Sequence, residues 1–415
     1  MLSGHVRLLR EEGRAILFGA LCLFMASPGQ TYVFAVFVGS LGLAAGLSPA
    51  ELGTLYLIGT LGSAALLPLA GHWIDRVDLK RYVALSFACL AAACFLGSIV
   101  NGPITLLIAF VALRLSGQGL MTHISVTSTA RYFGARRGLA LSMTSLGIAL
   151  SAAVTPIISV VAIGVIGWRL TYVAFGVFSL CIALPLLLML IVRRPTFTRP
   201  PPRSDGAREP RARDGMMILV RSRYFWFACA AMIFHPFTST ALIFHIESIG
   251  TSKGWSLDLV ATSFVAFAVG QVVSLLLAGA IIDRLGARTV LVLMNVPLMV
   301  GLVVFALSDH PTALFICLGL AGVTSGLFQT AVGAVWAEVY GTASLGTIRS
   351  AAHMLLVAST ACGPAAIGLG LELGFSVEAN LWVLLGIGIV ATMIAWRGIH
   401  PGPYRWKIGT KGNVG

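Results

Sequence analysis

Long apolar stretches alternate with short polar segments along almost the whole chain. Twelve of these stretches are almost free of charged residues and have about the length that crosses the hydrocarbon core of a bilayer, roughly 20 residues. They cover approximately residues 15–40, 52–70, 82–100, 104–126, 139–163, 170–192, 224–247, 258–281, 289–307, 312–336, 348–370 and 380–396. The pattern therefore predicts an all-α membrane protein with twelve transmembrane helices.

The composition favours a membrane protein over a soluble one. Hydrophobic residues make up 58% of the 415 positions, charged residues make up 10%, and the mean hydropathy is +0.93. A soluble domain cannot bury that much apolar surface, whereas lipid can cover it. All seven cysteines fall inside predicted spans, so we expect them to pack as small side chains and not to form disulfides or a metal site.

The net charge of +13 could indicate an anionic partner such as nucleic acid. Its distribution argues against that. If the N-terminus is cytoplasmic, all but three of the 28 lysines and arginines fall on the cytoplasmic side, the exceptions being Arg114, Arg169 and Lys253. This bias is the positive-inside rule. It predicts a multi-pass protein of a bacterial-type inner (plasma) membrane with both termini cytoplasmic, and no nucleic-acid partner.

Landmarks recur in the chain at a single offset of 208 residues. Gly71, Asp75 and Arg76, after the span 52–70, return as Gly279, Asp283 and Arg284 after the span 258–281. Further pairs at this offset are Pro28 with Pro236, Ser48 with Ser256, and Pro156 with Pro364. A shared offset in equivalent helices indicates a duplicated unit, so we expect two pseudo-symmetric bundles of six helices.

The segment between the two predicted halves is rich in arginine and proline. This composition cannot pack a core, so we expect an extended linker. The predicted organisation is an N-terminal bundle (1–192), a cytoplasmic linker (193–223), a C-terminal bundle (224–398) and a cytoplasmic tail (399–415).

The repeated loop resembles the G-x-x-x-D-R-x-G-x-[RK] signature of the major facilitator superfamily. Its second copy, Gly279 to Arg288, matches the signature, and its first copy, Gly71 to Lys80, carries Asp78 where a glycine is usual. The resemblance implies a secondary transporter whose two parallel six-helix halves enclose a substrate site near the middle of the membrane.

In that family the loop helps to hold the outward-facing state, with the aspartate near the start of a helix in the opposite half. A carboxylate at such a place gains about 0.3–1 kcal/mol. The resemblance thus implies that Asp75, Arg76, Asp283 and Arg284 are gate residues. The alternative, that they only obey the positive-inside rule, accounts for the arginines but not for the paired aspartates.

A narrower resemblance covers residues 130–140 (ARYFGARRGLA), then Pro156, then Gly167-Trp168-Arg169. This pattern is similar to the monocarboxylate and oxalate/formate branch of bacterial permeases, which implies a small organic anion as substrate. Two features depart from that branch. That branch often has a charged pair in the eighth span, whereas residues 259–281 contain no charged residue. Its bacterial members often have a lysine in the eleventh span, whereas the only ionisable side chain within the membrane there is His353.

Ionisable and polar residues within a membrane are costly and are therefore candidates for function. Arg114 lies about ten residues into the span 104–126, and Gln118 shares its helical face. Its guanidinium offers a planar fork for a carboxylate. The alternative is a role in packing or proton coupling.

Histidines supply the candidates for proton coupling, because their charge changes near neutral pH. His235 precedes Pro236 in the span 224–247, and His353 lies in the span 348–370. Glu247 is a third candidate, close to the outer end of its span together with His245. A neutral buried histidine and a solvated rim are the alternatives.

Uncharged polar residues complete the predicted site. Gln30 and Tyr32 follow Pro28 in a polar break of the first span, and Gln271 and Gln329 are isolated amides. The predicted substrate-binding residues are Arg114, Gln118, Tyr32, Gln30, His235, Gln271, Gln329 and His353.

The sequence has no phosphate loop, metal-spaced cluster or nucleophile elbow. We therefore expect no enzyme activity, no cofactor and no metal. The favoured function is secondary active transport of a small organic anion such as a monocarboxylate, with proton symport as an option. One alternative is efflux of amphiphilic or drug-like compounds, and another is a non-transporting membrane sensor on the same fold. The expected partners are the substrate, the lipid bilayer and, for symport, protons, and the protein is expected to be a monomer.

Overall fold

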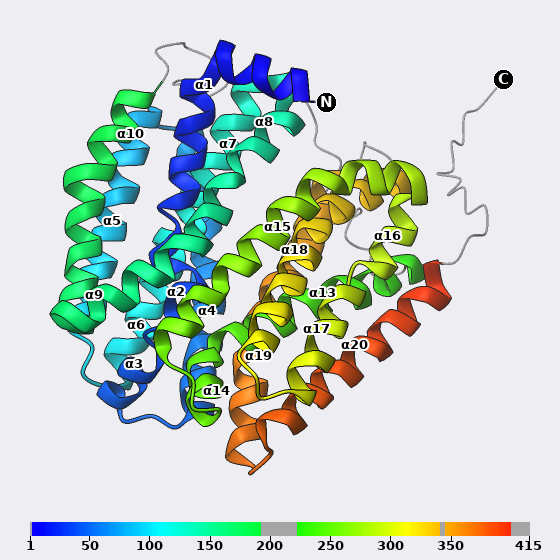
Figure 1. Ribbon diagram of the computed structural model, residues 1–415. Coiled ribbons are helices and arrows are strands. Elements are labelled where there is room, and N and C mark those ends of the chain that lie inside the picture. Colours follow the sequence, from blue (N-terminus) through cyan, green and yellow to red (C-terminus); the bar gives the residue numbers. More distant parts are fainter. Residues whose placement is uncertain (1, 192–221, 341–344, 400–415) are drawn as a thin grey trace.

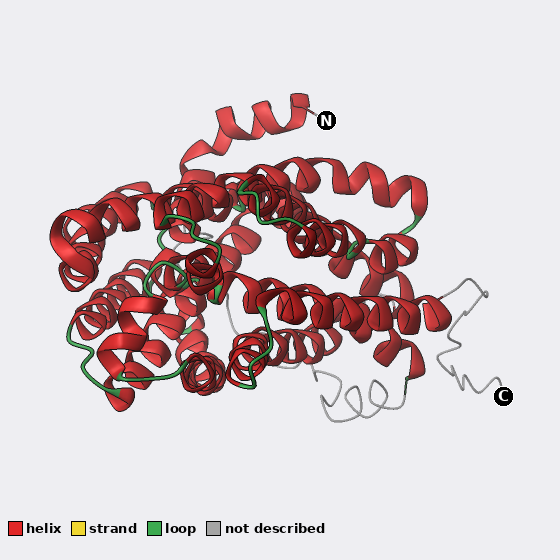
Figure 2. Cartoon of the chain, turned by 60° about the horizontal axis from the view of Figure 1, so that its bottom comes forward, coloured by secondary structure: helices red, strands yellow, loops and turns green. Residues whose placement is uncertain are grey.

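The computed structural model describes residues 2–191, 222–340 and 345–399. Within these ranges the chain is all-helical and has no strands, which confirms the predicted fold class at this level (Figure 2). Most of the predicted linker (193–223) and nearly all of the predicted tail (399–415) lie outside the described residues.

The N-terminal part forms one group of helices, coloured blue to green in Figure 1. Its α-helices are α1 (Leu2–Phe24), α2 (Thr31–Phe34), α3 (Val38–Ala45), α4 (Pro49–Gly71), α5 (Leu79–Ser98), α6 (Pro103–Leu113), α7 (Thr122–Phe133), α8 (Arg137–Thr144), α9 (Leu146–Phe178) and α10 (Leu184–Leu190). A 3-10 turn, Ser27–Gly29, separates α1 from α2, and a π-helical segment, Arg114–Met121, joins α6 to α7.

The C-terminal part forms a second group beside the first (Figure 1). Its helices are α13 (Arg223–Phe244), α14 (Ile246–Ser252), α15 (Leu257–Leu285), α16 (Ala287–Leu293), α17 (Val296–Leu307), α18 (Thr312–Tyr340), α19 (Leu345–Glu372) and α20 (Val377–Ile399).

In the described residues, ten helical segments are long and apolar enough to cross a membrane, judged by length and composition. The first predicted span, 15–40, is not one of them because it is divided among α1, the 3-10 turn, α2 and α3. The predicted spans 139–163 and 170–192 merge into one segment, Arg137–Leu190. Gly167 interrupts that segment with a φ of +79°. A straight helix of 54 residues would be roughly 80 Å long, far more than a bilayer is thick.

The repeat seen in the sequence corresponds to equivalent local structures. Ser48 and Ser256 are the N-caps of α4 and α15, and each accepts a hydrogen bond from the backbone N–H three residues later. Gly46 and Gly254, two residues before these serines, both have a positive φ, +67° and +73°. The matches at an offset of 208 therefore mark the same helix start in both halves.

The two copies of the signature loop solve the same turn differently. Gly286 has a φ of +81° and so uses the left-handed region that glycine tolerates. Asp78, at the equivalent position, has a φ of −58° and caps α5 by accepting a hydrogen bond from Lys80 N at 2.9 Å. In the first copy, a helix cap formed by Asp78 thus takes the place of the glycine turn.

The broken first helix lies directly against the π-helical segment. A Cβ atom added to Gly29 would be 2.2 Å from the carbonyl oxygen of Leu113, and one added to Gly117 would be 2.7 Å from the backbone nitrogen of Gly29. Small residues allow such backbone contact between membrane helices. The glycines therefore permit the break and the π-helix to share one contact.

The two halves meet through α4 with α19, α9 with α15, and the short helices α2 and α3 with α13 and α14. Glycines again allow close approach, since a Cβ on Gly53 would be 2.6 Å from Pro364 O and one on Gly368 would be 2.5 Å from Pro49 O. These contacts lie toward α3 and α14, at the bottom of Figure 1, which we call the α3–α14 end. At the opposite end α8 and α16 lie apart.

Charged residues tie the loops of the C-terminal half together at the α3–α14 end. Lys253 forms ion pairs with Asp309 and with Glu378, the latter at 3.0 Å, and its ammonium lies 5.9 Å from the centre of the Phe305 ring. Burial lowers the pKa of Lys253, but the two carboxylates outweigh that effect and raise it above its ordinary value. Lys253 is thus positively charged and links three connections between helices: its own, the one that contains Asp309 and the one before α20 that ends near Glu378.

The contact between Gly29 and Gly117 should be sensitive to a single methyl group. We expect Gly117→Ala to lower stability by about 1–3 kcal/mol, the usual cost of overpacking, because the new Cβ would meet backbone atoms at both nearest positions. Thermal unfolding of the purified protein in detergent measures the effect. Gly164→Ala is the control, since a Cβ there meets nothing within 4 Å, and it should leave the melting temperature equal or higher. Equal melting curves for the two variants would contradict this packing.

Candidate functional site

Arg114 is the first residue of the π-helical segment and is almost fully buried, with 3% of its surface exposed. Its Nη1 donates a hydrogen bond of 3.3 Å to the carbonyl oxygen of Gly29, in the break of the first helix. The guanidinium carbon lies 5.1 Å from the centre of the Tyr56 ring. Its Nε has no hydrogen-bond partner, and no acidic side chain of the described ranges forms an ion pair with it.

Tyr56 of α4 links this arginine to the surrounding helices. Its hydroxyl is 2.7 Å from that of Thr31 at the start of α2. Its ring lies 4.6 Å from the ring of Phe244, in the opposite half. Tyr56 therefore joins the buried cation, the broken helix and the interface between the halves.

Tyr32 belongs to a second group of polar residues in the N-terminal half. Its hydroxyl is 2.9 Å from the hydroxyl of Ser151 on α9, which is in turn 3.3 Å from that of Thr155. The ring of Tyr32 lies 6.5 Å from that of Phe264 on α15. Tyr32 thus spans from α2 to α9 and also reaches the other half.

The polar residues of the C-terminal half pair locally. His235 is buried, and its Nδ1 lies 3.0 Å from the hydroxyl of Ser239, one turn later on α13. The His235 ring is 5.2 Å from that of Phe328 on α18. Gln271 of α15 donates a hydrogen bond of 3.0 Å from Nε2 to Ser325, also on α18. Both predicted residues therefore lie against the same helix.

A cavity of about 500 Å³ lies between α18 and α19, toward the end opposite the α3–α14 end. Gln329 and His353 line it and are exposed, so two predicted residues share one cavity. Arg114 and Gln118 are not among its lining residues. The lining consists of Gln329, Val332, Gly333, Trp336, Ala352, His353 and Leu356.

The remaining predicted residues lie around the first helix and the α3–α14 end. Gln30 is buried and ends the 3-10 turn, while Gln118 is half-buried on the π-helical segment. Glu247 accepts a hydrogen bond of 2.8 Å from the backbone N–H of Gly39, in the other half. His245 Nε2 lies 2.8 Å from the carbonyl oxygen of Pro364. The candidate residues thus form several small groups.

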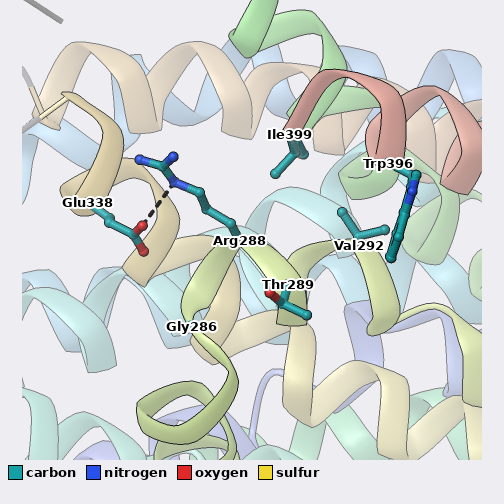
Figure 3. A pocket seen from close by; sticks show the side chains of 7 residues that line it. All are labelled: Gly286, Arg288, Thr289, Val292, Glu338, Trp396 and Ile399. Carbon is teal, nitrogen blue, oxygen red and sulfur yellow. Dashed lines mark ion pairs between the residues drawn. The ribbon is translucent and has the colours of Figure 1, made fainter. Parts of the chain in front are cut away.

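In the first signature loop, Asp75 pairs with Arg131 of α7, within its own half. Arg76, Asp283 and Arg284 are exposed. In the second loop it is Arg288 that forms an ion pair, at 2.9 Å, with Glu338 of α18. Figure 3 shows this pair beside a cavity of about 320 Å³, with Val292, Trp396 and Ile399 toward its other side. Each loop therefore forms an arginine–acid ion pair with a helix of its own half.

Sequence reasoning missed several partners of the predicted residues. Tyr56 and Ser325 come from other helices and carried no signal apart from a hydroxyl in an apolar span. Ser239 had a usable signal, because it follows His235 by four residues and so lies on the same helical face.

The chain is similar in sequence to known transporters. The profile of the Major Facilitator Superfamily matches residues 19–262 and 228–413. The MFS-type transporter pynF of Aspergillus niger is 24% identical over 265 residues, which is 62% of this chain. That match spans 57% of the length of pynF, somewhat more than half.

Solved structures share the fold. A bacterial homologue of the human lysosomal transporter Spinster, in an inward-facing and unoccupied conformation, aligns with a TM-score of 0.71 at 15% identity, covering 94% of this chain and 97% of that one. A single-residue mutant of the nucleoside transporter NupG aligns with a TM-score of 0.70 at 13% identity, covering 93% and 99%. With the profile matching both halves, the chain belongs to the Major Facilitator Superfamily, a family of membrane transporters and not of enzymes.

Proposed function

We propose that this protein is a secondary active transporter that moves a small organic anion, such as a monocarboxylate, by alternating access. The observation that best supports an anionic substrate is the environment of Arg114. An arginine cannot lose its proton in a protein, so its charge needs compensation wherever it is buried. Around Arg114 that compensation consists of one long hydrogen bond to a carbonyl and the face of Tyr56.

A carboxylate substrate would supply the missing counter-charge. The Nε of Arg114 is without a partner, and a guanidinium can bind a carboxylate through two parallel hydrogen bonds. The predicted ligands Gln118, Gln30 and Tyr32 belong to the same π-helical segment and broken helix. We assign them to the N-terminal side of the substrate path.

We assign His235, Gln271, Gln329 and His353 to the C-terminal side of that path. His235 and Gln271 lie against α18, and Gln329 and His353 line its cavity. The halves touch at the α3–α14 end while this cavity lies toward the other end. Such an arrangement corresponds to one of the two states that alternating access requires, closed on the first side and accessible on the second.

The proposal includes twelve membrane crossings with both termini in the cytoplasm of a bacterial-type cell. The broken first helix and the interruption at Gly167 support twelve crossings, and the positions of the basic residues support the orientation. The halves would be residues 1–192 and 224–398, joined by the linker 193–223, with a tail at 399–415. The protein would act as a monomer.

Gate function is proposed for the signature loops, with Asp75, Arg76, Asp283 and Arg284 as the gate residues. In this structure Asp75 pairs with Arg131 of its own half. We propose that Asp75 leaves Arg131 and contacts the C-terminal half instead when the end opposite the α3–α14 end closes.

Ligand-dependent thermal stability tests the anion directly. The purified protein should be stabilised by one or more of formate, oxalate, lactate and pyruvate. A ligand present at 100 times its Kd contributes about 2.7 kcal/mol, enough for a measurable rise in melting temperature. Arg114→Gln should abolish the rise, because it removes the charge and the fork.

Arg169→Gln is the matched control, because Arg169 binds the backbone carbonyls of Ser98 and Val100 after the end of α5 and not the broken helix that Arg114 contacts. It should lower the baseline melting temperature but keep the response to carboxylate. Stabilisation by hydrophobic drug-like compounds without any carboxylate response would instead favour efflux of amphiphilic compounds. An unchanged response in Arg114→Gln would remove this arginine from the site.

Proton coupling is the second part of the proposal, with His235, His353 and Glu247 as the candidate residues. If the carboxylate enters with a proton, adding it outside reconstituted vesicles should raise the external pH, since protons leave that compartment. His235→Gln or His353→Gln should weaken the pH change. A pH electrode or an external dye measures it, with protein-free vesicles correcting for passive entry of the undissociated acid.

His310→Gln serves as the matched histidine control. His310 is exposed in the connection before α18, where its ring bonds the Thr312 hydroxyl at 2.8 Å. This variant should behave as the parent protein does. A flat pH trace in the presence of demonstrated carboxylate uptake would exclude symport and leave exchange or facilitated diffusion.

A further inference from the structure

Gly39 and Glu247 are separated by 208 residues, the offset of the internal repeat, and they are in contact. Two positions related by a pseudo-twofold axis can touch only where both lie close to that axis. The helices that carry them are equivalent as well, since α3 begins at Val38 and α14 at Ile246. The contact therefore marks the axis between the halves at the α3–α14 end.

The contact joins a carboxylate to a helix N-terminus across the interface. Gly39 is the second residue of α3, so its N–H is one of the first four that have no partner within the helix. Phe37, the N-cap of α3, supplies no side-chain hydrogen bond. Glu247 Oε2 accepts from the Gly39 N–H at 2.8 Å and so takes the place of the missing cap.

The same carboxylate lies at the positive end of α3. The first turns of α3 and α14 both lie at this contact. The N-terminus of α3 carries partial positive charge, which favours an anion beside it. Gly39 is also required, because a Cβ at that position would lie 2.5 Å from Glu247 Oε1.

The neighbouring contacts between the halves at this end are of a different kind. Gly53 against Pro364 and Gly368 against Pro49 are backbone packing contacts, and Tyr56 against Phe244 is a ring contact. Packing of this type can slide and re-form, whereas a charge-assisted hydrogen bond is directional and must break when the halves separate.

We propose that Glu247 is the latch that holds the α3–α14 end closed, acting as a cap for α3 supplied by the opposite half. Opening that end removes the cap from α3 and exposes both helix ends to solvent. The latch therefore sets the balance between the two states of the transporter. This inference rests on the alternating access proposed above, but not on the identity of the substrate.

Distances between spin labels on the two halves test the latch. Labels attached to a ketone-bearing amino acid avoid the native cysteines. One pair replaces Leu43 and Leu373 at the α3–α14 end, and the other replaces Leu69 and Leu277 toward the other end; all four side chains are more than half exposed. Both pairs are measured by pulsed electron paramagnetic resonance in lipid nanodiscs without substrate.

We expect Glu247→Ala to raise the fraction of molecules that are open at the α3–α14 end about three- to tenfold, as the loss of a charged cap implies. The Leu69–Leu277 pair should move closer in the same molecules. Glu247→Gln keeps an acceptor but loses the charge, so its shift should be smaller. Gly39→Ala should also open this end, and combining it with Glu247→Ala should add little, because the clash requires the carboxylate.

Asp258→Asn is the control, since Asp258 is an exposed acid in the first turn of α15. It should leave both distance distributions unchanged. Unchanged distributions in both Glu247→Ala and Gly39→Ala would overturn the latch. Opening at the α3–α14 end without closer approach at the other end would also overturn it, by showing a local structural loss. Failure of carboxylates to stabilise the protein would refute the proposed substrate and leave this test intact.

Discussion

The break in the first helix must satisfy its own backbone, because a bilayer offers no water to unpaired carbonyl and amide groups. Arg114 meets this requirement by donating to Gly29 O, and Thr31 and Tyr56 pair their hydroxyls beside it. Gly29 and Gly117 bring the two backbones close enough for this to work. From this point α2 reaches α13, and Tyr32 reaches the Phe264 ring in the other half. A buried cation and the contact between the halves thus depend on the same few residues.

Features that repeat or alternate could be predicted from the sequence. The all-helical class followed from apolar stretches, and equivalent helix starts followed from the pair Ser48 and Ser256. Contacts between helices could not be predicted in the same way, because hydropathy says which residues avoid water but not which helix each side chain faces. Arg114 is the clearest case, since its helical face was identified but neither Gly29 nor Tyr56 was expected as its partner. The π-helical segment also changes the periodicity on which such faces are drawn.

Differences between the repeats carry more information about mechanism than their similarities. Asp78 caps a helix where Gly286 makes a left-handed turn. At the axis a glycine faces a glutamate. Two glutamates there would bring two carboxylates together, and two glycines would leave α3 without the side chain that caps it. At this contact the two halves therefore gain from being different.

The ion pairs of Lys253 have a mechanical consequence. By joining the connections that contain Asp309 and Glu378, this lysine makes one end of the C-terminal half stiff. Arg169 also stiffens this end of the N-terminal half, because it donates hydrogen bonds to Ser98 O and Val100 O. Connections that are joined in this way cannot shift separately, so this end of each half should move as one rigid piece. When the two halves move apart there, the strain falls on the contacts between the halves and not on the connections within each of them.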